Sequence, residues 1–337
     1  MGGRAIGRGS VGGAGLLFVP LLVGAVLALG AHGLGAQGAT ATGVPAGSAP
    51  ATNPAAVTSP AATAVTSPAA TVTAAVSSAA AAAAAAPAVR SAAATTGARQ
   101  TAADAAAAYA VRAGWQTGIA IVDLRTGQIT TAGAATTHFP AESTIKLLLA
   151  AHLLAAGEMT GDVAAAAHAM VVASDDDAAN ALYELAGGDG VGAWAAARYG
   201  VPALAALAGP VNGPGQWGSL PVSALGMAQF LAAAADDPAV GPWLTATMAQ
   251  LEPIAADGTD QRFGIKAAAP EAAVKQGWGG DVPGLDAEGT PSIGYVDGRY
   301  AVAIYTLHAP AVDQAGAQAM VTAQARLLLP GGHVPAL

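Results

Sequence analysis

The stretch Phe139-Pro140-Ala141-Glu142-Ser143-Thr144-Ile145-Lys146 decides how this chain is interpreted, and it leads directly into Leu147-Leu148-Leu149-Ala150-Ala151. Pro140 is excluded from a helix interior, while the residues after it are strong helix formers with almost no polar side chain. We therefore predict a buried helix that begins close to Ser143. Residues three apart lie on one helix face, so this helix would bring the Ser143 hydroxyl and the Lys146 amine together.

The helix start adds a second property to Ser143. Backbone N–H groups at a helix N-terminus are unpaired and stabilise negative charge, so a nucleophile, an amine and an oxyanion-binding end would meet there. The plainer alternative is a serine that caps the helix and a lysine that extends its amine to the surface. The chain has three lysines, and only Lys146 follows a serine by three residues. This pair alone does not separate the two interpretations.

Residues 1–36 have the layout of a secretory signal. Arg4 and Arg8 precede an uncharged apolar run from about Leu16 to Leu29, and small residues after it offer cleavage points. An uncleaved N-terminal anchor is the alternative, although the run is short for a membrane-spanning helix. The chain has no cysteine, so we expect neither a lipid-anchored cysteine nor disulfides. We predict a secreted or cell-envelope protein.

Residues 37–100 consist almost entirely of Ala, Thr, Ser, Pro and Gly, with near-repeats such as Val57-Thr58-Ser59-Pro60 and Val65-Thr66-Ser67-Pro68. This composition cannot build a core, and it predicts a disordered linker or stalk. The remaining residues, 101–337, are enough for one domain. They carry nine Lys and Arg against 21 Asp and Glu, a net charge of −12. Such a domain is a poor partner for nucleic acid or anionic lipid, and it is compatible with a small substrate.

Strand patterns stand at both ends of this domain, with helical patterns between them. We predict one antiparallel sheet shared by the two ends and flanked by helices, plus an all-helical subdomain, which is an α+β fold. A cleft between the two parts is the default site. The predicted strands are 118–124 and 128–131, joined as a hairpin, and 272–277, 291–296 and 300–308, with Asp297-Gly298 as a hairpin turn. The predicted helices are 101–112, 162–173, 176–185, 190–198, 222–235, 240–251 and 314–328.

Two further features fall where that cleft is expected. Ser174-Asp175-Asp176-Asp177-Ala178-Ala179-Asn180 lies between two predicted helices, and its plain interpretation is a capping stretch. Val274-Lys275-Gln276-Gly277-Trp278-Gly279 is a strand that ends in glycines. Its plain interpretation is an edge strand whose lysine prevents aggregation.

Class A β-lactamases and penicillin-binding proteins carry a set of three motifs in the order Ser-x-x-Lys, Ser-Asp-Asn and Lys-Thr-Gly. The three features of this chain come in the same order. Over about residues 101–330 the chain resembles this superfamily, most sharply in Phe139-Pro140-x-x-Ser143-Thr144-x-Lys146. Lys275-Gln276-Gly277-Trp278 resembles the Lys-Asn-Gly-Trp variant of exported actinobacterial serine hydrolases. The resemblance implies a β-lactamase/transpeptidase-like fold.

The resemblance also implies roles for individual residues. Ser143 would be the acylated nucleophile, with Lys146 as its base if burial and a nearby cation such as Lys275 lower the pKa of the amine. Ser174 would relay a proton to the leaving-group nitrogen. The backbone N–H groups of Ser143 and Trp278 would form the oxyanion hole. The expected substrate-binding residues are Asp176, Gln276 and Gly277, and Lys275 with Gln276 would hold a substrate carboxylate.

The chain departs from the family pattern in two ways that bear on turnover. Asp176 stands where the family has Asn, and an ionised carboxylate cannot donate a hydrogen bond and would raise the pKa of Lys146. Hydrolytic class A enzymes also carry a loop glutamate that activates the deacylating water. Between Asp189 and Asp236 this chain has no Asp or Glu, and Asn212 is no base.

We therefore predict an active-site-serine hydrolase that forms an acyl-enzyme with β-lactams or acyl-D-Ala-type peptides and deacylates slowly. The alternative is a non-catalytic module on the same fold that binds cell-wall peptides or a partner. We expect no cofactor and no metal, a monomer, and contact with a membrane only through an uncleaved anchor. Ser143, Lys146, Ser174 and Lys275 are the predicted catalytic residues.

Overall fold

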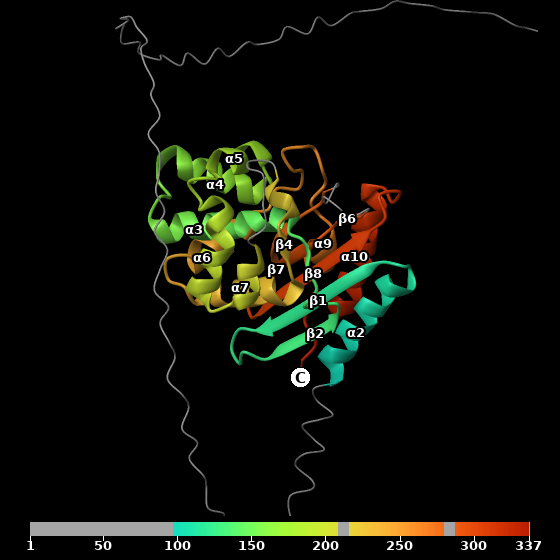
Figure 1. Ribbon diagram of the computed structural model, residues 1–337. Coiled ribbons are helices and arrows are strands. Elements are labelled where there is room, and N and C mark those ends of the chain that lie inside the picture. The colour runs from blue at the N-terminus through green and yellow to red at the C-terminus, as the bar shows by residue number, and fades with distance from the viewer. Residues whose placement is uncertain (1–96, 208–215, 280–286, 337) are drawn as a thin grey trace, which may run out of the picture. The chain divides into compact units, whose positions relative to one another are not determined.

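The computed structural model describes residues 97–207, 216–279 and 287–336 (Figure 1). The predicted signal, almost all of the predicted linker and Asn212 lie outside the described residues. No helix in the described ranges is long and apolar enough to cross a membrane.

The core of the fold is an antiparallel sheet built from both ends of the described chain, as predicted. Its strand order is β2-β1-β8-β7-β5, and the short β6 also pairs with β8. Ile119 on β1 lies opposite Ile304 on β8, so segments about 185 residues apart become neighbours in the sheet. The strands are β1 (Gln116–Asp123), β2 (Ile129–Gly133), β5 (Ala273–Gln276), β6 (Glu288–Gly289), β7 (Ser292–Val296) and β8 (Tyr300–His308).

Helices cover both faces of this sheet, which explains why β1, β7 and β8 are apolar along most of their length. Side chains alternate along a strand, so Ile119 and Ile121 pack into one core with helices α2 (Gly97–Arg112) and α10 (Gln314–Leu328). The intervening Ala120 faces a second core that includes α7 (Ala224–Asp236). Figure 1 shows α2 and α10 on one side of the strands and α7 among the helices on the other.

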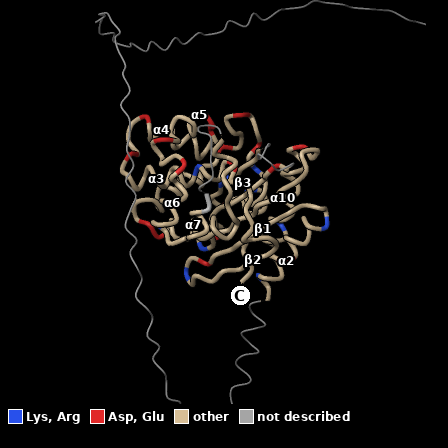
Figure 2. Tube along the Cα trace, in the orientation of Figure 1, with Lys and Arg blue, Asp and Glu red and all other residues tan. Residues whose placement is uncertain are grey.

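The predicted helical subdomain is present, and it packs on the second core. Figure 2 shows its acidic residues gathered around α4 and α5. Its helices are α3 (Lys146–Ala156), α4 (Gly161–Val172), α5 (Asp176–Leu182), α6 (Val191–Tyr199) and α8 (Gly241–Met248). The prediction missed short elements that have no apolar period: β3 (Phe139–Pro140) paired with β4 (Pro221–Val222), strand β6, and helix α9 (Gly264–Ala268).

The predicted boundary between linker and domain was wrong by four residues. Helix α2 begins at Gly97. Its residue Arg99 is buried, and the guanidinium donates hydrogen bonds to the Tyr300 hydroxyl at 3.1 Å and the Pro335 carbonyl at 3.3 Å. Residues 97–100 therefore belong to the folded domain. An alanine-rich sequence hides this boundary, since the partners of Arg99 lie about 200 residues away.

The helix predicted to begin at Ser143 starts as a 3₁₀ turn. This turn, η1 (Glu142–Ile145), follows β3 and passes directly into α3 at Lys146. The Ala141 N–H donates to the Leu220 carbonyl at 2.8 Å, which fixes the entry of the chain. Helix α3 is buried on nearly all sides and ends at Gly157, whose φ of 75° is the left-handed conformation typical of a C-cap.

Candidate active site

The structure brings the three motifs to one small cleft of about 200 Å³. Ser143 comes from η1, Asp176 from the first turn of α5, and Trp278 from the segment that follows β5. The cleft is also lined by Glu142, Asn180, Trp217, Gly218, Ser219 and Gly279.

The Lys146 amine lies on the floor of this region. Lys146 is fully buried, and its amine donates to the Ser174 carbonyl at 2.7 Å and to the Ser174 hydroxyl at 3.3 Å. It also donates to the Asp176 carboxylate at 2.5 Å and lies 4.7 Å from the centre of the Trp217 ring. The alternative in which Lys146 extends to the surface is therefore wrong.

Lys275 approaches the same serine from the sheet. It is fully buried, and its amine donates to the Ser174 hydroxyl at 2.9 Å and to the Gln276 carbonyl at 2.8 Å. β5 is an edge strand of the sheet, as the plain interpretation proposed, but its lysine is buried and bonded to Ser174. The Ser174 hydroxyl thus lies between the two lysine amines, which is the geometry that a proton relay requires.

Ser174 is held in a backbone conformation that a serine rarely adopts. Its φ is 53°, in the left-handed region, which costs about 1–3 kcal/mol for a residue other than glycine. The next residue, Asp175, caps α5 by accepting the Ala178 N–H at 2.9 Å. The second motif therefore does cap a helix, as its plain interpretation proposed, and the same turn also directs Ser174 toward the lysines.

Burial lowers the pKa of both lysine amines at this site. Burial lowers the pKa of Lys146, although the Asp176 carboxylate opposes that shift. Burial, followed by the charge of Lys146, brings the pKa of Lys275 well below its ordinary value. Asp176 does act in the expected direction on the Lys146 pKa, but desolvation outweighs it.

Ser143 lies beside this network without joining it. Within the described residues, the hydrogen bonds of the Lys146 amine go to Ser174 and Asp176 and not to the Ser143 hydroxyl. Ser143 does not cap η1 through its side chain either. The amine must therefore exchange one of its partners before it can accept the Ser143 proton.

The end of β5 lies directly against the start of η1. The Gly277 N–H donates to the Pro291 carbonyl at 3.0 Å, and a Cβ placed on Gly277 would lie 3.1 Å from the Ser143 backbone nitrogen. Glycine is required at this position because the two segments approach so closely. The predicted oxyanion donors, Ser143 and Trp278, therefore come from adjoining segments, and the Trp278 indole donates to Asp257 at 2.9 Å.

The structure corrects the role predicted for the Gln276 side chain. Successive side chains on a strand point to opposite faces, so Gln276 points away from Lys275. Gln276 is fully buried, and its amide donates to the carbonyls of Gln261 at 3.1 Å and Phe263 at 2.6 Å. It therefore cannot hold a substrate carboxylate.

Sequence reasoning missed two residues of the cleft and one residue that contacts it. Trp217 lines the cleft and donates its indole N–H to the Asn180 amide oxygen at 2.8 Å. Asp257 reaches Trp278 from a distant loop and left no signal in the sequence. Glu142 was visible as the residue before Ser143, but nothing in the sequence indicated that its carboxyl is buried.

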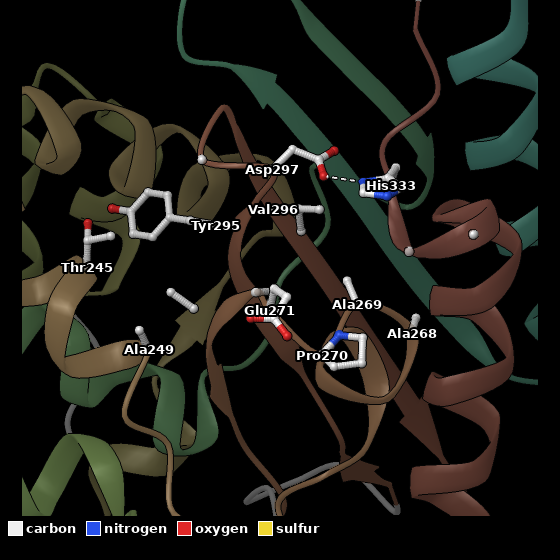
Figure 3. A pocket seen from close by; sticks show the side chains of 15 residues that line it. Thr245, Ala249, Ala268, Ala269, Pro270, Glu271, Tyr295, Val296, Asp297 and His333 are labelled. Atoms are coloured by element: carbon white, nitrogen blue, oxygen red, sulfur yellow. Dashed lines mark hydrogen bonds and ion pairs between the residues drawn. The ribbon is translucent and has the colours of Figure 1, made fainter.

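A larger pocket, of about 480 Å³, lies elsewhere, beside α8, α9 and the β7–β8 turn (Figure 3). Its ionisable lining residues are Glu271, Tyr295, Asp297 and His333, and the last two are paired at 2.6 Å. Asp297 belongs to the predicted hairpin turn, which is present with positive φ at both central residues. None of the three motifs contributes to this pocket, so the small cleft is the candidate site.

Comparisons with known proteins bear on the fold and on the family of this chain. No protein-family model matches the chain. β-Lactamases match it in structure: an ancestral class A enzyme (GNCA) with a TM-score of 0.51 and 21% identity, and a β-lactamase from Streptosporangium roseum with 0.53 and 19%. These matches cover 67% and 68% of this chain and 98% and 97% of the two enzymes. At this identity they establish the fold.

The sequence relatives are mycobacterial. The protein LppW of Mycobacterium tuberculosis (strain ATCC 25618 / H37Rv), whose name proposes a lipoprotein, is 31% identical over 238 residues. The match covers 67% of this chain and 73% of the relative, and the Mycobacterium bovis protein of the same name matches equally. The chain therefore belongs to the family of mycobacterial LppW, and its fold is that of the class A β-lactamases.

Proposed function

We propose that this protein is an active-site-serine acyl-transfer enzyme that forms an acyl-enzyme at Ser143. Its substrates would be β-lactams or acyl-D-Ala-type peptides. The observation that carries this proposal is the position of the Ser174 hydroxyl between the Lys146 and Lys275 amines, at 3.3 and 2.9 Å. The Lys146 amine is in turn bonded to Asp176, which lines the same cleft as Ser143. A structural core has no need of two buried amines on one hydroxyl, because burying them is costly.

In the proposed reaction, the neutral Lys146 amine takes the Ser143 hydroxyl proton while the oxygen attacks the substrate carbonyl. The backbone N–H groups of Ser143 and Trp278 hold the resulting oxyanion, and each such donor is worth about 2.7–4 kcal/mol in other enzymes. The proton then moves from Lys146 through the Ser174 hydroxyl to the leaving nitrogen. The bond from the carbonyl carbon to that nitrogen breaks, and the acyl group stays on Ser143.

Two features would make this enzyme slow. The Lys146–Asp176 pair must open before the amine can accept the Ser143 proton, which adds to the acylation barrier. The chain has no Asp or Glu between Asp189 and Asp236 to activate a deacylating water. The acyl-enzyme is therefore expected to accumulate.

The Lys146–Asp176 pair also favours a second candidate, a non-catalytic module that binds cell-wall peptides or a partner in the same cleft. In that case the amine would be permanently occupied by the carboxylate. A binder forms no covalent adduct, so covalent labelling separates the two functions.

The proposed location is the cell envelope or the exterior of the cell. The name of the LppW relatives supports it, and so does the signal-like N-terminus of this chain. This chain has no cysteine that could carry a lipid, so its attachment to a membrane would depend on the apolar N-terminal segment.

The test is covalent labelling of the purified chain with a fluorescent penicillin, followed over time by intact mass. We expect wild type and Ser219→Ala, a control within the same cleft, to gain the mass of the intact penicillin, and Ser143→Ala to gain none. An unlabelled wild type would contradict the proposal. Sustained cleavage of a chromogenic cephalosporin faster than about 10 per second, the median for enzymes, would contradict slow deacylation.

A further inference from the structure

Glu142 is a buried acid in the position directly before the nucleophile. It is 7% exposed, and its φ of 47° places a non-glycine residue in the left-handed region. A residue other than glycine keeps such a conformation only where the surrounding structure holds it in place.

Four glycines make the space that the Glu142 side chain fills. A Cβ on Gly279 would overlap the carboxylate, and a Cβ on Gly277 would lie 2.8 Å from the Glu142 Cβ. A Cβ on Gly289 or Gly218 would lie 3.0 or 3.3 Å from the carboxylate oxygens. The carboxyl therefore sits in a fitted niche.

This niche adjoins the proposed oxyanion hole, and Glu142, Gly218 and Gly279 also line the cleft. Gly277 and Gly279, which both pack on Glu142, are the two neighbours of Trp278, and Glu142 itself precedes Ser143. Each of the two proposed oxyanion donors, Ser143 and Trp278, is therefore a sequence neighbour of residues that form this niche. A charge on the Glu142 carboxyl would act on the oxyanion at short range and through little water.

The surroundings of Glu142 favour its neutral form. Burial, with smaller contributions from the Asp176 and Glu288 carboxylates, raises the pKa of Glu142 to about 8. From β8, Tyr305 also faces it, and burial raises the pKa of that phenol far above the physiological range, so it brings no charge. The two cleft lysines direct their amines to Ser174, Asp176 and the Gln276 carbonyl.

We propose that Glu142 is a protonated positioning residue whose neutral carboxyl supports the two segments that carry the oxyanion donors, and whose ionisation opposes acylation of Ser143. The inference rests on the proposed function. Ionisation of Glu142 would set the upper limit of the pH range in which the enzyme acylates, because a carboxylate beside the oxyanion hole repels the developing oxyanion.

The first measurement is the acylation rate with the fluorescent penicillin between pH 6 and 10. We expect the wild-type rate to fall at least tenfold with a midpoint near pH 8, and the fall to be absent in Glu142→Gln. Glu288→Gln serves as a matched control that removes one of the neighbouring charges. It should shift the midpoint to lower pH, since Glu288 helps to keep Glu142 protonated. A fall that persists unchanged in Glu142→Gln would overturn the proposal.

The second measurement does not depend on catalysis. The melting temperatures of wild type and Glu142→Gln, or Glu142→Met if the first variant folds poorly, should diverge as pH rises from 5 to 8 and stay apart above 8. Parallel curves would overturn the inference whether or not Ser143 reacts. No adduct at any pH in either protein would overturn the proposed function, and with it the catalytic part of this inference.

Discussion

The Lys146 amine lies 2.5 Å from the Asp176 carboxylate, and the two partners differ completely in exposure: the lysine side chain is 0% exposed and that of the aspartate 65%. The lysine is thus held by the fold, while the aspartate faces the cleft and can leave the pair. When a substrate enters, the exposed carboxylate can move into solvent, while the buried amine keeps its hydrogen bonds to Ser174.

Replacing Asp176 by Asn should accelerate acylation of Ser143 about tenfold. The amide keeps the shape of the side chain, ends the pairing with Lys146 and removes a charge that raises the pKa of the amine. Labelling with fluorescent penicillin at pH 7 measures the rate, and Asp177→Asn, on the neighbouring exposed position, is the control. A slower Asp176→Asn enzyme would mean that the carboxylate takes part in the reaction.

Replacing Gln276 by Leu should weaken the fold and leave substrate recognition unchanged. The Gln276 amide is the buried donor to the Gln261 and Phe263 carbonyls, and its loss costs about 1–3 kcal/mol of unfolding free energy. Urea denaturation measures the loss. The concentration of penicillin that gives half the maximal labelling rate should stay within about twofold of the wild-type value. A tenfold rise would indicate that Gln276 does bind the substrate carboxylate.

The Asp123–Arg299 pair should make the free energy of unfolding depend on pH in the acidic range. Arg299 donates two hydrogen bonds to the buried Asp123 carboxylate, at 3.1 and 2.6 Å, and they lower the pKa of Asp123 to about 2. Because the pKa is lower in the folded state, the stabilisation is present above the unfolded value of 3.8 and is lost as pH falls toward 2. It amounts to about 2 kcal/mol.

Urea unfolding of wild type and Asp123→Asn at pH 5.0, 3.5 and 2.0 checks this expectation. The difference in unfolding free energy between the two proteins should shrink across that range. A difference that stays constant would show that the pair contributes through packing and not through charge.

Gly279 and Glu142 should be energetically coupled. Replacing Gly279 by Ala places a methyl group where the Glu142 carboxyl lies, and such overpacking costs about 1–3 kcal/mol. In a Glu142→Ala background the same substitution should cost almost nothing, because the niche is then empty. The four proteins form a double-mutant cycle in thermal or urea unfolding, and a coupling energy below about 0.5 kcal/mol would contradict the fitted niche.

Much of this protein was determined by local sequence. Pro140 and the apolar run after it place a buried helix, short apolar runs place β1 and β8, and Asp297-Gly298 closes a hairpin. Each of these features depends on neighbours within a few residues, so the sequence alone predicts it. The order of the three motifs is also visible in the sequence, and the resemblance that it carries predicted the fold.

What the tertiary structure decided is which side chains meet. The Ser174 hydroxyl and the Lys275 amine are 101 residues apart in sequence, and only the packing of the turn between α4 and α5 against β5 joins them. The same packing turns Gln276 away from the cleft and closes the Glu142 niche with glycines from three separate segments. Periodicity records which face of an element is apolar, but it carries no information about the element that will cover it.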